Sequence, residues 1–347
     1  PRTMRRCLAA VTFIACGSNT PAALPDAPAS PWSTAPEIPV PRLESGVTAI
    51  GQSVAVVGGF DTNQQAGLDV TTRVDLFDTF EQTWTQLPDA PVARHHVQIA
   101  AIGTTLYLLG GLDGAPDITN NYPARGDSFK LDIANTAAGW QPLAPIPAGY
   151  ERGSAAVVVT PPRIYLLGGA ATTDAVASNI IYDVIQDQWI TNELPDLPAK
   201  RSHPAAVRRV DGTFVVVGGL SGLGSDTAEQ DVFRLYNDQQ TSTGTWVAGT
   251  PMPERRGGCA YGLIQGQLIC AGGEAATSAL KYTQGYDVLN DTWTDYDNMP
   301  LSTAGTLGAT IGQRLYVPGG ARELVFEPVS TMFVFSPLDA ADTGSAR

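Results

Sequence analysis

Short apolar runs that end in a pair of glycines recur six times along this chain. One of them reads TTLYLLGG at positions 104 to 111, and the others repeat the same order of apolar residues and glycines. An apolar run of about four to eight residues that is stopped by glycine is typical of a buried β-strand. The first glycine of each pair stands at positions 58, 110, 168, 218, 272 and 319. We therefore expect a fold built from six similar β-rich units.

Each unit but the last also carries an apolar stretch with an Asp, followed by a tryptophan. The pattern predicts four strands per unit: an apolar strand, the strand that ends in Gly-Gly, the strand with the Asp, and an outer strand with the Trp. The glycines permit a tight bend and leave room for a bulky side chain of the neighbouring unit, while the indole packs between units. The tryptophans are Trp84, Trp140, Trp189, Trp246 and Trp293.

This pattern resembles the kelch repeat. Kelch repeats recur at about 50 residues and WD40 repeats at about 40 to 45, and here the glycine pairs are 47 to 58 residues apart. The resemblance covers residues 31 to 337 and implies an all-β fold, a six-bladed β-propeller whose blades close into a ring. Together with the N-terminal segment described below, it indicates an exported, lipoprotein-like bacterial type.

The ends of the chain predict how the ring closes. The sixth unit has MFVFSP at 332 to 337 where its Asp strand belongs, but no tryptophan follows. Trp32 precedes Arg42 by ten residues, just as Trp84 precedes Arg94. We therefore expect residues near 31 to 37 to supply the outer strand of the sixth blade.

Composition agrees with this fold and restricts the partners. The 347 residues include 36 Gly and 26 Pro, which favours turns over helices. The formal net charge of -13 argues against a nucleic-acid partner, because a phosphate backbone is held by a surplus of Lys and Arg. We expect no cofactor.

The first 16 residues have the order of an export signal. A basic start at 4 to 6 precedes nine apolar residues, CLAAVTFIA, which are too few to span a bilayer. The quartet FIAC resembles a bacterial lipobox, which implies lipidation of Cys16 and membrane attachment through that lipid alone. The alternative is an ordinary signal peptide cleaved near the same place. We expect a periplasmic or cell-surface protein with a flexible tether at 17 to 30 and a disordered tail at 338 to 347.

Five of the six units carry an arginine in the turn after the outer strand, 16 or 17 residues before the glycine pair. Animal kelch adaptors use such arginines to grip acidic peptides. The resemblance therefore implies an arginine-bearing mouth that binds an anionic protein segment or glycan, as guanidinium groups suit carboxylates. The alternative is that each arginine belongs to the fold and bonds backbone carbonyls. The five are Arg42, Arg94, Arg152, Arg201 and Arg256, and the sixth unit has Thr303.

Other residues near this predicted mouth are candidates for binding or catalysis. The longest loop after a glycine pair contains Asn121 and Tyr122, which suit peptide or hydroxyl-rich ligands. Tyr150 and Glu151 precede Arg152, and Glu151 is the candidate for a general base. Bacterial sialic-acid epimerases are six-bladed kelch proteins, so an epimerase or mutarotase acting on an acidic sugar is an alternative function.

The histidines and cysteines give weaker signals. His96 and His203 each follow a turn arginine by two residues, but neither HExxH nor a Cys/His spacing is present, so we expect structural histidines and no metal. Cys259 and Cys270 lie on adjacent strands of the fifth unit. With a two-residue turn, Cys270 faces Tyr261 and Cys259 lies diagonally from it, so the sequence leaves open a disulfide or two buried thiols.

These signals favour a binding scaffold over an enzyme. A purely architectural surface domain is the third alternative. The sequence does not identify the ligand.

The predicted anchor can be tested directly. If Cys16 is lipidated, the mature protein partitions into the detergent phase, and Cys16→Ser moves it to the aqueous phase. Equal partitioning of the two proteins would remove the lipoprotein interpretation.

Overall fold

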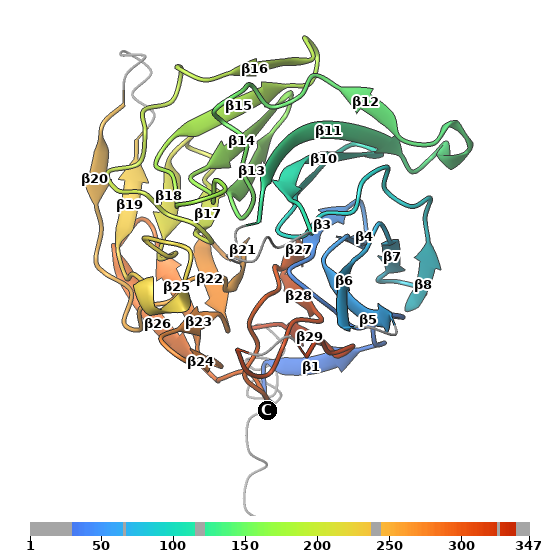
Figure 1. Cartoon of the computed structure of the whole chain (residues 1–347). Helices are drawn as coiled ribbons and strands as arrows, with labels where there is room; N and C mark the ends of the chain where they lie inside the picture. The colour runs from blue at the N-terminus through green and yellow to red at the C-terminus, as the bar shows by residue number, and fades with distance from the viewer. Residues whose placement is uncertain (1–29, 65–66, 115–121, 237–243, 325–326, 338–347) are drawn as a thin grey trace, which may run out of the picture.

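The computed structural model describes residues 30 to 337, apart from 65–66, 115–121, 237–243 and 325–326. In this part of the chain, six four-stranded antiparallel sheets surround a central axis (Figure 1). The first strand of each sheet lies nearest the axis and the fourth lies at the rim (Figure 1). The predicted all-β, six-bladed propeller is confirmed.

The strands of the six blades follow the order expected from the repeats. Blade one contains β3 (Gly46–Ile50), β4 (Ser53–Val57), β7 (Val74–Asp78) and β8 (Thr83–Gln86). Blade two contains β9 (Gln98–Ile102), β10 (Thr105–Leu112), β11 (Ala124–Asp132) and β12 (Gln141–Leu143). Blade three contains β13 (Ala156–Thr160), β14 (Arg163–Leu167), β15 (Asn179–Asp183) and β16 (Gln188–Ile190).

The second half of the ring repeats this arrangement. Blade four contains β17 (Ala205–Arg208), β18 (Phe214–Val217), β19 (Val232–Leu235) and β20 (Trp246–Ala248). Blade five contains β21 (Ala260–Ile264), β22 (Gln267–Ala271), β25 (Thr283–Asp287) and β26 (Thr292–Tyr296). Blade six contains β27 (Ala309–Ile311), β28 (Arg314–Pro318), β29 (Met332–Phe335) and β1 (Trp32–Ala35).

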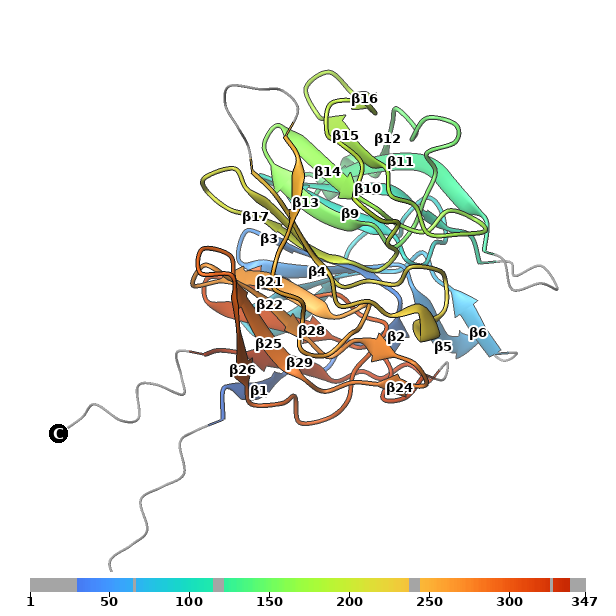
Figure 2. The same cartoon turned by 90° about the vertical axis from the view of Figure 1, so that its left-hand side faces the viewer.

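Several short elements lie at one end of the ring. We call this end the mouth. One is a small sheet of β2 (Arg42–Leu43), β5 (Phe60–Gln64) and β6 (Gly67–Val70), and another is the hairpin of β23 (Glu274–Ala275) and β24 (Ser278–Ala279). Both β5 and β23 directly follow a glycine pair. In the side view of Figure 2, β5, β6 and β24 lie at the right-hand end. The 3₁₀ turns are η1 (Thr136–Ala138) and η2 (Ser225–Thr227).

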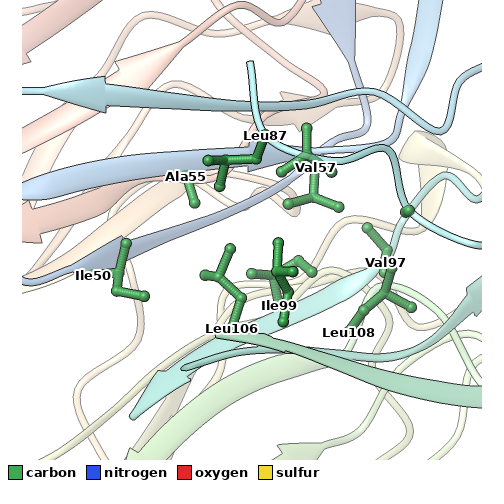
Figure 3. Close-up of a cluster of buried hydrophobic side chains, with 11 residues drawn as sticks. Ile50, Ala55, Val57, Leu87, Val97, Ile99, Leu106 and Leu108 are labelled. Atoms are coloured by element: carbon green, nitrogen blue, oxygen red, sulfur yellow. The ribbon is translucent and has the colours of Figure 1, made fainter. Parts of the chain in front are cut away.

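The hydrophobic core lies between the facing surfaces of neighbouring blades. Between blades one and two, Ala55 and Val57 of β4 pack with Ile99, Leu106 and Leu108, all almost completely buried (Figure 3). Similar clusters fill the other interfaces. Because a sheet with two apolar faces cannot bury both alone, each blade depends on its two neighbours.

The glycine pairs make the contact that joins each blade to the next. A Cβ at Gly58 would lie 2.4 Å from the carbonyl oxygen of Arg94, and the N–H of Gly59 donates to that oxygen at 2.8 Å. At Gly58 the group that needs the space is a backbone carbonyl, and at Gly110 the bulky side chain of Ile146 is also close, 2.7 Å from such a Cβ. The same bond recurs around the ring, from Gly111 to Arg152, Gly169 to Arg201, Gly219 to Arg256, Gly273 to Thr303 and Gly320 to Arg42.

The tryptophans join the blades a second time, at the rim. Trp84 donates its indole N–H to the carbonyl of Pro36, which follows the outer strand of the preceding blade. The remaining blades repeat this bond at 2.9 to 3.0 Å, with Trp140 to Pro88, Trp189 to Ala144, Trp246 to Pro195, Trp293 to Thr250 and Trp32 to Asp297.

The N-terminal strand closes the ring as predicted. β1 pairs antiparallel with β29, with Trp32 opposite Phe335. The Trp32 ring is buried and packs on Phe333 and Phe335 with centroids 6.2 and 5.1 Å apart. Blade six is therefore built from both ends of the described chain.

Four of the five turn arginines are almost fully buried, and the fifth, Arg94, is 9% exposed. Arg152 donates to the carbonyls of Gly168 and Ser178 at 2.9 and 2.7 Å. Arg256 donates to the carbonyl of Tyr282 and to the Gln284 side chain. The others pair with acidic residues, Arg42 with Asp75, Arg94 with Asp127 and Arg201 with Asp231. We call the turn that carries this arginine, just before the first strand of each blade, the inner turn. Each guanidinium group therefore bonds its inner turn to other residues of the same blade.

Cys259 and Cys270 form a disulfide, with Cα atoms 5.6 Å apart. Cys270 pairs with Tyr261 in the ladder, as a two-residue turn predicts. The diagonal bridge fits because the regular ladder ends at Ala260, and glycines with positive φ at 258, 272 and 273 bend both chains there. A disulfide is typical of proteins in oxidising compartments.

Several predictions fall on residues 1–29 and 338–347, outside the described part of the chain. The signal peptide, lipidation of Cys16, most of the tether and the tail therefore stay predictions. Among the described residues, no helix reaches the length and apolar character that a membrane crossing requires.

Closure by β1 predicts a large effect of Trp32→Ala. This change removes a buried indole and its inter-blade hydrogen bond, and we expect it to lower the free energy of unfolding by about 3 to 5 kcal/mol. The matched control is Phe80→Ala, because Phe80 is 86% exposed and its loss should cost less than about 0.5 kcal/mol. Chemical denaturation of both variants measures the difference. A chain shortened to begin at Pro41 that melts like the full chain would contradict closure by this strand.

Candidate functional site

The six inner turns place one residue each in the left-handed backbone region, close to the axis of the ring. This residue follows the turn arginine, or Thr303, by two positions. Its φ lies between 51° and 65° in all six blades. The six residues are Glu44, His96, Ser154, His203, Gly258 and Gly305.

Backbone hydrogen bonds connect these residues around the mouth. The N–H of His96 donates to the carbonyl of Glu44 at 2.8 Å, and the N–H of Ser154 donates to the carbonyl of His96 at 2.9 Å. The same bond runs from His203 to Ser154, from Gly258 to His203 and from Glu44 to Gly305. We call this arrangement the axial ring. Since its backbone is fixed, its side chains hold defined positions at the mouth.

Three side chains of the axial ring converge. Ligand-type atoms of Glu44, His96 and His203 all lie within 4.8 Å of one another. His96 Nε2 lies 3.0 Å from a carboxylate oxygen of Glu44. The His96 and His203 rings meet edge to face, with centroids 4.9 Å apart. Three different blades thus contribute to one polar cluster.

Hydrogen bonds behind His96 determine which of its nitrogen atoms carries hydrogen. His95 is fully buried, and its Nε2 lies 3.2 Å from the carbonyl oxygen of Asp113. Because a carbonyl only accepts, this nitrogen carries the hydrogen and His95 Nδ1 is an acceptor. His96 Nδ1 contacts that acceptor and must donate to it. His96 therefore presents Nε2 to Glu44.

His203 is oriented in a similar way. Ser202 donates its hydroxyl hydrogen to the carbonyl of Gly222 at 2.8 Å, so its oxygen accepts from His203 Nδ1 at 3.1 Å. His203 Nε2 is then the acceptor and receives the hydroxyl of Ser154 at 3.1 Å. The lone pair of Nε2 therefore points to the Ser154 hydroxyl, within the axial ring, and not into the blade.

The cluster shifts the pKa values of its members. Burial alone would raise the pKa of Glu44, but the positive charge and hydrogen bond of His96 outweigh it, and the pKa falls to about 2. Burial, followed by repulsion from His96, lowers the pKa of His95 to about 2 and that of His203 to about 4. Burial and the charge of Glu44 raise the pKa of Glu274 to about 7. Glu44 is thus ionised at neutral pH, while Glu274 is close to its midpoint.

Two small hollows at the mouth border the cluster. One, of about 30 Å³, is lined by Glu44, His96, His203 and Glu274. The other, of about 140 Å³, lies beside it and combines carboxylates with apolar walls. It is lined by Leu43, Glu44, Glu274, Ala304, Gly305, Ala321, Glu323 and Leu324. Further along the axis, a hollow of about 380 Å³ is lined mainly by apolar residues of the innermost strands.

The arginine-bearing mouth expected from the sequence differs from this geometry. The guanidinium groups of Arg42, Arg94, Arg152, Arg201 and Arg256 are buried and bonded within the fold, as the structural alternative anticipated. The expected presentation of five arginines to an anionic ligand was therefore wrong. None of them lines either hollow at the mouth, and the charged groups there are mainly carboxylates.

The other candidate residues have separate positions. Glu151 accepts the N–H of Gly149 at 2.7 Å and so stabilises its own turn, while the carbonyl of Tyr150 accepts from Arg152. Tyr122 lies in the mouth, with its ring 4.5 Å from that of His95, and burial raises its pKa. Asn121 lies outside the described residues.

Sequence reasoning missed Glu44 and Glu274 and treated the histidines as structural. The equal offsets of His96 and His203 from their arginines were a valid signal. Glu44 has the same offset from Arg42, so extending that comparison to every blade would have found the cluster.

Comparisons with known proteins place the fold in context. No family model matches the chain. The chain is 32% identical over 306 residues to Kelch-like protein terF of Aspergillus terreus, covering 83% of this chain and 64% of that protein. It is 24% identical to Kelch-like protein 25 of Xenopus tropicalis, covering 78% of this chain and 43% of that protein. The chain thus spans less than two thirds of these relatives.

A solved structure shares the architecture. The structure of YjhT superimposes with a TM-score of 0.70 at 18% identity, covering 86% of this chain and 96% of that one. The closed ring of six blades is a six-bladed β-propeller, and its glycine-pair repeats and these matches show that the chain is similar to kelch-like proteins.

Proposed function

We propose that this propeller is a protein-interaction scaffold that binds a Lys or Arg side chain of a partner segment at its mouth. The observation that carries the proposal is the hollow of about 140 Å³ beside the axial ring. Similarity to kelch-like proteins supports a protein partner.

The lining of this hollow suits a long basic side chain. Leu43, Leu324 and two alanines offer apolar contact for a methylene stem. Glu44, Glu274 and Glu323 offer carboxylates for the charged end. A small apolar group would leave the carboxylates of Glu274 and Glu323 without a counter-charge, whereas Lys and Arg satisfy both parts of the hollow.

The electrostatics favour a cation over the anionic ligand that the sequence suggested. The chain carries a formal net charge of -13, and the five turn arginines are buried and bonded inside the blades. An anionic peptide or acidic sugar would meet repulsion at this mouth. This argument also weakens the epimerase alternative, which needs a carboxylate surrounded by available arginines.

The proposal predicts selection of basic peptides from a random phage-displayed library in the presence of EDTA. The affinity should fall as salt rises, because part of the attraction is electrostatic. It should rise between pH 6 and pH 8, because a bound cation favours the ionised form of Glu274, whose pKa is about 7. Glu274→Gln should weaken binding about tenfold and abolish the pH dependence.

Two controls separate this site from the earlier arginine interpretation. Glu151→Gln changes a carboxylate that caps its own turn and should leave affinity unchanged. Arg256→Leu leaves buried carbonyls unpaired, so it should lower the melting temperature while the folded fraction binds normally. Enrichment of acidic peptides, or binding only to neutral glycans on an array, would contradict the proposal.

A further inference from the structure

The axial ring contains a set of convergent nitrogen and oxygen donors. Glu44, His96 and His203 come from blades one, two and four, and their side chains are only partly buried. We propose that these three residues bind a divalent metal ion of the zinc class at the axis of the propeller. This inference goes beyond the proposed function and does not depend on it.

The donor atoms suit such an ion. Two imidazoles and one carboxylate are a common ligand set for Zn²⁺ and related first-row ions, and a site with three protein ligands keeps one position open. Bonds of 2.0 to 2.2 Å in a tetrahedral site separate ligand atoms by about 3.4 Å. Here Glu44 and His96 are 3.0 Å apart, and all three donor atoms lie within 4.8 Å, so small side-chain rotations complete the geometry.

The hydrogen bonds behind the histidines direct lone pairs into the site. The Asp113 carbonyl holds hydrogen on His95 Nε2, His95 Nδ1 accepts from His96 Nδ1, and His96 presents Nε2. The Gly222 carbonyl fixes His203 in the same sense through Ser202, and His203 Nε2 accepts from the Ser154 hydroxyl, a hydrogen bond that a bound metal ion replaces. Second-shell hydrogen bonds of this kind orient histidine ligands in metal sites and are absent from a solvent-facing imidazole.

The close approach of His96 Nε2 to the Glu44 carboxylate requires a proton or a metal ion between the two atoms. Neutral His96, with its hydrogen on Nδ1, would place a nitrogen lone pair 3.0 Å from a carboxylate oxygen. Two acceptors at this distance repel, so either a proton on Nε2 or a metal ion must lie between them. A metal ion that displaces this proton can also bind His203. A proton shared between His96 and Glu44 makes no bond to His203.

The backbone supports the donors without needing their side chains. Each of the three residues has φ near 50°. The hydrogen bonds that join it to its neighbours in the axial ring use only main-chain atoms. Asn tolerates this backbone region, so His96→Asn and His203→Asn should keep the fold while removing a ligand. Glu44→Gln keeps the size of the side chain and removes the charge.

The test uses the full untagged chain, treated with EDTA, dialysed, and with its free thiols blocked by N-ethylmaleimide so that Cys7 and Cys16 cannot bind metal. Calorimetric titration with ZnCl₂ should give one saturable site per chain. CoCl₂ should give visible d–d absorption bands of a nitrogen- and oxygen-ligated ion, which ZnCl₂ displaces.

Each of Glu44→Gln, His96→Asn and His203→Asn should weaken zinc binding at least tenfold at an unchanged melting temperature. Glu151→Gln is the matched control and should bind zinc like the parent, because its carboxylate caps a neighbouring turn. No saturable binding by the parent, or equal binding by the parent and all three ligand variants, would overturn the proposal.

Discussion

The hydrogen bond from the second glycine of each pair to the carbonyl of the next inner turn holds the six blades around one axis. It connects Gly59 to Arg94 and returns, five blades later, from Gly320 to Arg42. The first glycine must have no side chain because a Cβ there would collide with that carbonyl, at 2.4 Å in the case of Gly58. The recurrence of Gly-Gly along the chain follows from this single contact between blades.

The chemistry of the mouth is a consequence of the same turn. Once its arginine carbonyl accepts from the preceding blade and its guanidinium group is bonded inside its own blade, the chain must reverse within two residues. It does so through one residue with positive φ, which joins the axial ring. The fold therefore requires six residues near the axis but leaves most of their side chains free to vary. In this chain Glu44, His96 and His203 occupy those positions, and they form the cluster.

The sequence predicted those features that depend on spacing along the chain. The offset of Trp32 from Arg42 predicted closure by β1, because equivalent offsets mean equivalent strands. Spacing did not reveal side-chain direction, so the arginines were assigned to the mouth although they are buried in the turns. The disulfide was left open because a regular ladder makes Cys259 and Cys270 diagonal, and only the bend at the glycines shortens that distance. The Glu44 cluster was missed because only the histidines were compared by their offset, although Glu44 follows Arg42 by the same two residues.

The central claim is that the fold fixes imidazole groups at the axis in defined tautomers, so that they form a site and not merely a surface. The chain has three histidines, all of which lie at this cluster, and the spectra of His96→Asn and His203→Asn assign their NMR signals. Long-range ¹⁵N–¹H spectra of the ¹⁵N-labelled protein should find His95 and His203 neutral at pH 6, with hydrogen on Nε2 and Nδ1 respectively. Titration of His95 and His203 near pH 6.5, about the value of an exposed imidazole, would contradict the account.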